Sequence, residues 1–178
     1  MKKITQFSSG FTFIELLVTL AIVSILMGVA IPSMRNIISS SRLTTQANSM
    51  VGALTVARSE AAKRNKIIVV RKVGGSWASG WQVFEDVNDS DHIYNATGDT
   101  DDKLIQTYEA ITGSTINTTF PNYIAYRPDG RSNLIGGSFY ICSPAESTAF
   151  RRIVIANSGR IRTETQKTRP DIKYKDHC

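Results

Sequence analysis

An apolar run near the N-terminus, residues 14–31, constrains this chain more than any other feature. The only polar members of the run are Glu15, Thr19 and Ser24. As a helix, residues 11–32 would be about 33 Å long at about 1.5 Å per residue, which is enough to cross a hydrocarbon core of about 30 Å. We therefore expect a single membrane-spanning helix over residues 11–32.

The residues before this run indicate its orientation. Lys2 and Lys3 precede it, so the positive-inside rule predicts a cytoplasmic N-terminus and sends the rest of the chain outward. An ordinary secretory signal has a small-residue cleavage site after its apolar segment, but here the helical pattern continues past Ile31. The small residues, SSG at positions 8–10, stand before the run instead.

This arrangement has a specific counterpart among known leaders. Gly10 is followed by FTFIELLVTLAIVSILMGVAIP, in which glutamate is the fifth residue and proline is the last. This order of residues resembles the class III leader of type IV prepilins. The resemblance implies that prepilin peptidase removes residues 1–10 by cutting between Gly10 and Phe11, that Phe11 is N-methylated, and that the helix stays on the mature protein. A plain signal anchor with an incidental glutamate is the alternative.

Glu15 is the one carboxylate within the apolar run. A carboxylate in hydrocarbon costs on the order of 3 kcal/mol, less near a helix end, and normally has a partner. Cleavage would create a new α-amine at Phe11, four residues before Glu15 and so on the same helical face. The prepilin resemblance implies that Glu15 pairs with the N-terminal amine of a neighbouring subunit and drives filament assembly.

Beyond the membrane segment, residues 33–65 are expected to continue as an amphipathic helix. Apolar residues recur along one face at alternating steps of four and three: Leu43, Ala47, Met50, Leu54, Ala57 and Ala61. Pro32 disturbs the hydrogen bond to the carbonyl of Gly28, which predicts a kink or a loosened turn. The helix is expected to end near Asn65, a residue that tolerates the left-handed conformation.

From Lys66 onward, the sequence changes to short β-branched or aromatic runs separated by turn residues. The runs are KIIVVRK, GWQVFED, KLIQTYEA, YIAYR, GGSFYIC and RRIVIAN, and the turns are GGS, NDSD, RPDG and NSGR. Short strands joined by tight turns indicate antiparallel sheet. The predicted fold is α+β, with a long N-terminal helix, half transmembrane and half amphipathic, packed on an antiparallel β-sheet domain at residues 66–178.

The order of motifs in this domain also has a counterpart. The motifs of the domain follow in this order: a GWQVFED strand, an acidic loop, a YRPDGR turn and a C-terminal NSGRIR. This order resembles that of the FimT/FimU minor pilins and the GspH pseudopilins. The resemblance implies an inner-membrane protein with a periplasmic domain that becomes a priming or tip subunit of a type IV pilus at the cell surface. Its partners would be other minor pilins, the major pilin, prepilin peptidase and the inner-membrane assembly platform. A GspH-type pseudopilin of type II secretion is the alternative.

The net charge of +6 is unevenly spread, and residues 151–178 hold eight Lys or Arg against three acids. Such a cluster suits phosphate contacts. GRIR at positions 159–162 matches a G-R-x-R motif of FimT proteins linked to DNA uptake, which implies binding of double-stranded DNA in natural transformation by Arg160, Arg162, Lys167 and Arg169. Arg160 and Arg162 would point to the same side if both lie on a strand. A solvated basic surface, or docking on an acidic patch of another pilin, is the alternative.

The two cysteines, Cys142 and Cys178, form no CxxC motif. A disulfide between them is permitted in an oxidising compartment, which the predicted orientation supplies. The bond would close a loop of about 37 residues, stabilise the domain by a few kcal/mol and fix the C-terminal tail. We expect this bond, with two free thiols as the alternative.

Residues 85–102 hold seven acids and no Lys or Arg, which raises a calcium hypothesis. The EF-hand pattern fails, because Ser90 and Asp91 stand where that loop requires Asp or Asn and Gly, so a solvated loop or a complement to a basic neighbour is favoured. His92 and His177 form no metal-ligand spacing, and the sequence has no nucleophile elbow or phosphate-binding glycine loop. We predict no enzymatic activity, no cofactor and no metal site.

Overall fold

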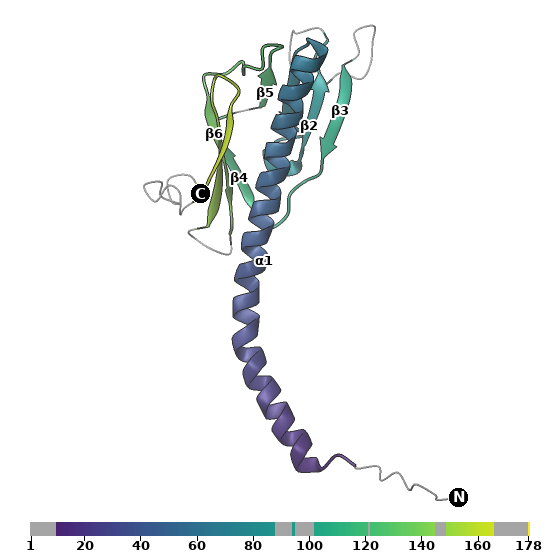
Figure 1. Ribbon diagram of the computed structural model, residues 1–178, viewed down its shortest axis with the longest axis vertical. Helices are drawn as coiled ribbons and strands as arrows, with labels where there is room; N and C mark the ends of the chain where they lie inside the picture. The colour runs from purple at the N-terminus through teal and green to yellow at the C-terminus, as the bar shows by residue number, and fades with distance from the viewer. Residues whose placement is uncertain (1–9, 88–93, 95–101, 121, 145–148, 166–177) are drawn as a thin grey trace, which may run out of the picture. The chain divides into compact units, whose positions relative to one another are not determined.

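The fold class predicted from the sequence, α+β with a long N-terminal helix and antiparallel sheet, is confirmed. The computed structural model describes residues 10–87, 94, 102–120, 122–144, 149–165 and 178, and divides into two compact units, Met1–Ile38 and Ser39–Cys178. The elements are α1 (Phe13–Arg64), β1 (Ile68–Lys72), the 3-10 helix η1 (Trp77–Ser79), β2 (Trp81–Glu85), β3 (Lys103–Tyr108), β4 (Thr115–Thr118), β5 (Tyr123–Tyr126), β6 (Gly137–Cys142), β7 (Phe150–Ile155) and β8 (Ile161–Thr165) (Figure 1).

The Met1–Ile38 unit consists, in its described part, of the first portion of α1. Phe13–Ile31 is one helix that is long and apolar enough to cross a membrane, and its large apolar side chains are exposed. A helix that is apolar on all sides has no polar face to turn toward water, so it requires lipid or protein around it. The helix is continuous through Gly28 and position 32. A kink there stays a prediction.

The remainder of α1 packs on the strands of the Ser39–Cys178 unit, beside which it lies in Figure 1. The predicted apolar seam is confirmed, since each of its members is at most 1% exposed: Leu43, Ala47, Met50, Leu54, Ala57 and Ala61. Ala53, which is not in the predicted seam, is buried beside them. The helix ends at Arg64, and Asn65 follows with φ of 55°, the left-handed conformation expected at this position.

Two four-stranded antiparallel sheets, ordered β3-β2-β1-β5 and β4-β6-β7-β8, complete this unit. All six apolar runs predicted as strands form strands. In the first sheet, β1 and β2 pair from Ile68 with Glu85 to Lys72 with Trp81. Neither β8 nor β4 is among the six predicted strands: β8 follows the NSGR turn, and β4 has Ile116 as its only large apolar residue. Pairing with β6 along its whole length holds β4 in the sheet.

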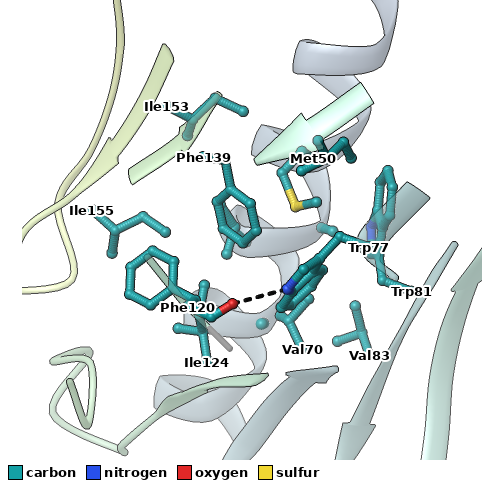
Figure 2. Close-up of a cluster of buried hydrophobic side chains, with 14 of the residues drawn as sticks. Met50, Val70, Trp77, Trp81, Val83, Phe120, Ile124, Phe139, Ile153 and Ile155 are labelled. Atoms are coloured by element: carbon teal, nitrogen blue, oxygen red, sulfur yellow. Dashed lines mark hydrogen bonds between the residues drawn. The ribbon is translucent and has the colours of Figure 1, made fainter. Parts of the chain in front are cut away.

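One main core lies between α1 and the two sheets, and Figure 2 shows part of it. Trp77 and Phe139 meet edge to face, with ring centroids 4.9 Å apart. Trp77 Nε1 donates a hydrogen bond to the carbonyl oxygen of Phe120 at 3.0 Å. The fully buried members of this core all fall between Leu43 and Ile155, so the core belongs entirely to the Ser39–Cys178 unit.

Candidate functional site

The start of α1 is closed by reciprocal hydrogen bonds between Thr12 and Glu15. The backbone N–H of Glu15 donates to Thr12 Oγ1 at 3.3 Å, and the N–H of Thr12 donates to Glu15 Oε2 at 3.2 Å. The Thr12 hydroxyl donates to the same Oε2 at 3.1 Å. This is a capping box, which satisfies backbone N–H groups that a helix start leaves unpaired. The T-x-x-E pattern at positions 12–15 is the signature of this contact, which was not among the predictions.

Glu15 keeps one oxygen for a further partner, because Oε1 accepts no hydrogen bond from any residue that the structure describes. Gly10 is exposed and Phe11 is 69% exposed, so the Gly10–Phe11 peptide bond is accessible in this unit. Cleavage after Gly10, methylation of Phe11 and the assembly role of Glu15 stay predictions.

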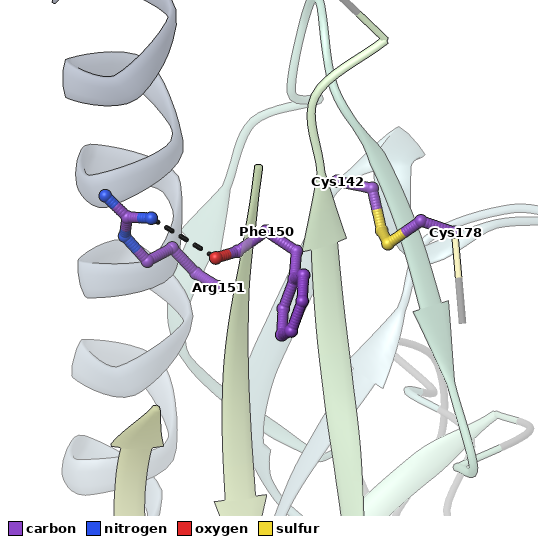
Figure 3. The surroundings of a disulfide bond; sticks show 4 residues. All are labelled: Cys142, Phe150, Arg151 and Cys178. Carbon is purple, nitrogen blue, oxygen red and sulfur yellow. Dashed lines mark hydrogen bonds between the residues drawn. A yellow bond between two sulfur atoms is a disulfide. The ribbon is translucent and has the colours of Figure 1, made fainter. Parts of the chain in front are cut away.

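Cys142 and Cys178 form a disulfide, with Cα atoms 5.9 Å apart (Figure 3). Cys142 is the last residue of β6 and pairs with Phe150, the first residue of β7. Both are buried with Tyr140 in a small cluster separate from the main core. The bond therefore attaches Cys178 to the end of β6, which is hydrogen-bonded to β4 on one side and to β7 on the other.

Two turns in the Ser39–Cys178 unit are joined by Arg58 of α1. Residues 127–131 form the turn after β5, and residues 156–160 connect β7 to β8. Arg58 Nε donates to the carbonyl oxygen of Gly130 at 3.0 Å, and Nη2 donates to that of Ser158 at 3.2 Å. One guanidinium thus fixes both turns to the helix. The sequence predicted the two turns but not this residue.

Packing accounts for the glycine of the GRIR motif. Gly159 has φ of 75°, a conformation in which a side chain is strained, and an added Cβ would collide with the carbonyl oxygen of Gly130. That Cβ would also lie 3.1 Å from Arg58 Nε. Gly159 is therefore required by the contact between the two turns, whatever the motif binds.

Arg160 and Arg162, the predicted DNA contacts, differ in their surroundings. Because β8 begins at Ile161, Arg162 lies on the strand whereas Arg160 belongs to the turn before it. Both are exposed, but Arg162 Nη2 lies 3.9 Å from Glu164 Oε1, so part of its charge is balanced. The other two predicted contacts lie outside the described residues: Lys167 and Arg169.

A depression of about 310 Å³ opens beside the 127–131 turn. The residues that line it include Arg127, Arg131, Asn133, Leu134, Ile135 and Asn157, and we call it the arginine depression. Arg127 and Arg131 are exposed, and neither forms an ion pair with a carboxylate in the described part of the chain. Ile135 is 97% exposed. The RPDGR motif predicted a turn here and gave no signal of a site.

The described acids of segment 85–102 are structural. Glu85, Asp86 and Asp102 are buried; Glu85 Oε2 pairs with Arg64 Nη1 at 3.2 Å, and Asp102 Oδ1 accepts a hydrogen bond from Val87 N at 3.0 Å. Most of the segment that raised the calcium hypothesis lies outside the described residues. Within the described ranges, no group of three or more His, Cys, Asp or Glu residues could hold a metal ion.

The titratable groups with shifted pKa values form no catalytic pair. Burial raises the pKa of Tyr126 and of Tyr108 above the usual range for tyrosine. A hydrogen bond from Arg64 lowers the pKa of Glu60 at the exposed end of α1.

A capped apolar helix of membrane length that continues into an α+β domain defines a pilin-like subunit. Residues 46–159 match the family model described as Type II transport protein GspH, and residues 6–31 match the prokaryotic N-terminal methylation motif. The GspH match spans more than half of the chain, so this protein belongs to the GspH family. Comparison with curated protein sequences gives no match.

Solved structures support the same fold. Two crystal structures of the type IV minor pilin FimU from Pseudomonas aeruginosa resemble this chain. One has a TM-score of 0.56 at 17% identity, over 70% of this chain and 89% of FimU. The other has a TM-score of 0.54 at 18% identity, over 68% and 92%. The minor pseudopilin EpsH from the Type 2 Secretion System of Vibrio cholerae gives a TM-score of 0.49 at 13% identity, over 70% and 97%. The GspH family match confirms the expected resemblance to GspH pseudopilins, and the two FimU structures show the same fold as this chain.

Proposed function

We propose that this chain is a minor pilin that prepilin peptidase cleaves after Gly10, that is N-methylated at Phe11, and that primes or caps a type IV pilus. The first unit carries the proposal. Its helix is exposed, apolar and of membrane length, and its capped start holds one carboxylate with an unused oxygen. The subunit would sit in the inner membrane with its Ser39–Cys178 unit in the periplasm, and would join other minor pilins and the major pilin through the assembly platform.

The chemistry of Glu15 explains how assembly would be driven. An ionised carboxylate in hydrocarbon is unfavourable by on the order of 3 kcal/mol. In the isolated subunit, Thr12 offsets part of this cost through its two hydrogen bonds to Oε2. The α-amine of a neighbouring subunit would bring the opposite charge to Oε1, and a charge-assisted hydrogen bond in an apolar setting is stronger than one from a hydroxyl. Transfer from the bilayer into a filament would therefore be favoured.

The test follows the tagged full-length chain in cells that assemble it. We would measure leader cleavage by mass, membrane insertion by fractionation, and incorporation by recovery in sheared filaments. We expect Glu15→Leu to be cleaved and inserted but recovered in filaments at least tenfold less. Thr19→Ala is the matched control, because Thr19 is also polar and donates only to the carbonyl oxygen of Leu16 within the helix. Equal recovery of Glu15→Leu and wild type would refute the role of Glu15.

The tagged wild type and a strain in which the gene is deleted separate the remaining alternatives. An uncleaved chain that never enters filaments would indicate a membrane-anchored domain. Loss of protein secretion with intact pili after deletion of the gene would assign the chain to a type II secretion pseudopilus. Loss of surface pili with intact secretion is the result we expect.

Double-stranded DNA is a second candidate partner, supported by the exposure of Arg160 on a turn that Arg58 fixes against the 127–131 turn. We expect DNA affinity that falls steeply with salt, and a slope of log K against log salt that is shallower by about 1.8 when Arg160 and Arg162 are both replaced by alanine. Lys63→Ala/Lys66→Ala removes the same charge elsewhere and is the control. An equal loss in both double variants would mean that only net charge matters.

A further inference from the structure

We infer that the arginine depression docks a segment of a neighbouring pilin-like subunit that bears a carboxylate next to an apolar side chain. This inference rests on the proposed function and names a contact within the assembly. Three properties of the described residues lead to it: the fixed position of the loop, the cations without carboxylate partners, and an apolar side chain held in solvent.

The loop that carries Ile135 is fixed on both sides. Before it, the N–H of Asn133 donates to the carbonyl oxygen of Ala125 at 2.9 Å, and Asn133 Oδ1 accepts from the N–H of Ala125 at 3.0 Å. After it, Gly136 has φ of 92°, and an added Cβ would lie 3.2 Å from the carbonyl oxygen of Ile155. Because this backbone is already ordered, a partner that covers Ile135 loses little conformational entropy on binding.

The cations of the depression are equally well placed. Arg127 and Arg131 flank the turn, where the N–H of Arg127 donates to the carbonyl oxygen of Arg131 at 2.9 Å. Asp129 lies in the same turn, but its Oδ1 accepts the N–H of Arg131 at 2.9 Å and neither guanidinium forms an ion pair with it. Arg58 anchors this turn from beneath through Gly130. Two guanidinium groups beside a fixed backbone suit bidentate binding of a carboxylate.

The composition of the depression favours a protein segment over nucleic acid. Leu134 and Ile135 contribute apolar surface, and Ile135 is 97% exposed, so a partner that covers it removes apolar surface from water. A phosphate backbone has no apolar group to place there. In a protein segment, an acidic side chain can bind the guanidinium groups while the apolar side chain next to it covers Leu134 and Ile135. Protein interfaces commonly combine an apolar centre with arginines in this way.

The test uses the full-length chain in cells that assemble it, with the photoreactive residue benzoylphenylalanine replacing Ile135. We expect an adduct with another subunit that carries a prepilin leader, and peptide mapping should place the link within a few residues of an Asp or Glu. Arg127→Glu/Arg131→Glu should reduce the adduct at least fivefold, as should the milder Arg127→Gln/Arg131→Gln if the first variant does not accumulate. A lysine at the mapped acid should restore the adduct of the glutamate variant.

Two controls make the outcome specific. Benzoylphenylalanine at Leu104, which is 46% exposed on β3, should not give the same adduct. Arg160→Ala/Arg162→Ala should leave the Ile135 adduct unchanged, since those residues do not line the depression. A nuclease-sensitive adduct, a link to a second copy of this chain, or a link to a segment without acids would each overturn the inference.

Filament recovery, measured in the same cells, separates this inference from the proposed function. If the chain is cleaved and recovered in sheared filaments but Ile135 gives no adduct, the inference is wrong and the function stands. If the chain is neither cleaved nor recovered, the proposed function itself has failed.

Discussion

Replacing Gly159 by alanine tests whether the glycine of the GRIR motif serves packing. Gly159 has φ of 75°, and its added Cβ would collide with the carbonyl oxygen of Gly130 and lie 3.1 Å from Arg58 Nε. Gly74 is the matched control, since it has φ of 68° but nothing lies within 4 Å of its added Cβ. Both variants place an alanine in the left-handed region, and only one creates a collision.

The expected magnitudes follow from these contacts. Left-handed alanine costs about 1–2 kcal/mol, and this is the whole effect expected for Gly74→Ala. In Gly159→Ala, the two turns must also separate, which weakens the hydrogen bonds of Arg58 to Gly130 and Ser158. Each such bond contributes about 1–1.5 kcal/mol. We therefore expect Gly159→Ala to destabilise the domain by about 3–5 kcal/mol, about 2–3 kcal/mol more than Gly74→Ala.

Urea unfolding of the Ser39–Cys178 unit measures this difference, because the whole main core lies within that unit. With a slope near 2 kcal/mol per molar urea, the midpoint of Gly159→Ala should fall about 1 M or more below that of Gly74→Ala. Equal midpoints would refute the packing explanation. The glycine would then need a functional reason of its own.

Three further predictions concern stability. Trp77→Phe should destabilise the domain by about 1–2 kcal/mol more than Trp81→Phe in urea unfolding, since Trp77 Nε1 has a buried hydrogen bond and Trp81 Nε1 is buried without one in the described chain. Tyr126→Phe should be neutral or stabilising by up to about 1 kcal/mol at pH 7, because this buried hydroxyl has no partner among described residues. Burial raises the pKa of Tyr126, so the folded state keeps a proton that the unfolded chain loses near pH 10. Above pH 10, the free energy of unfolding of the wild type should therefore fall by about 1.4 kcal/mol more per pH unit than that of Tyr126→Phe. Reduction of the Cys142–Cys178 bond should lower stability by about 4 kcal/mol in the loop-closure model, and a Cys142→Ser/Cys178→Ser variant should not respond to reductant.

The fold could be predicted where the sequence carries its own periodicity. The seam from Leu43 to Ala61 repeats at helical spacing, and six strands are apolar runs bounded by turn residues, so local pattern and tertiary burial agree. The strand Thr115–Thr118 has no such pattern. It is a strand because β6 offers a hydrogen-bonding edge, which is a property of the assembled sheet and cannot be read from three polar residues and one isoleucine.

The candidate sites also differ in whether local sequence or tertiary packing determines them. The bond between Thr12 and Glu15 is local, so the T-x-x-E signature could have given it. Arg58 could not have been found, since its acceptors are backbone carbonyls of residues 72 and 100 positions away, and a carbonyl is present whatever the residue type. An arginine on the polar face of an amphipathic helix is expected to be solvated. Arg58 binds both turns only because the packing of the domain places their carbonyl oxygens beside it.

Packing accounts for the glycines of the two turns, and the exposed arginines that packing does not account for are the candidates for a functional role. Gly130 and Gly159 have positive φ and lie where the turns meet, so the fold requires them. The fold does not require the exposed charges of Arg127, Arg131 and Arg160, because solvated surface charges stabilise little and like charges held together repel. An anionic partner would offset that repulsion. Arg58 holds the backbone of both turns in place, and Leu134 and Ile135 line the depression together with Arg127 and Arg131. This surface therefore suits an anion that also carries an apolar group.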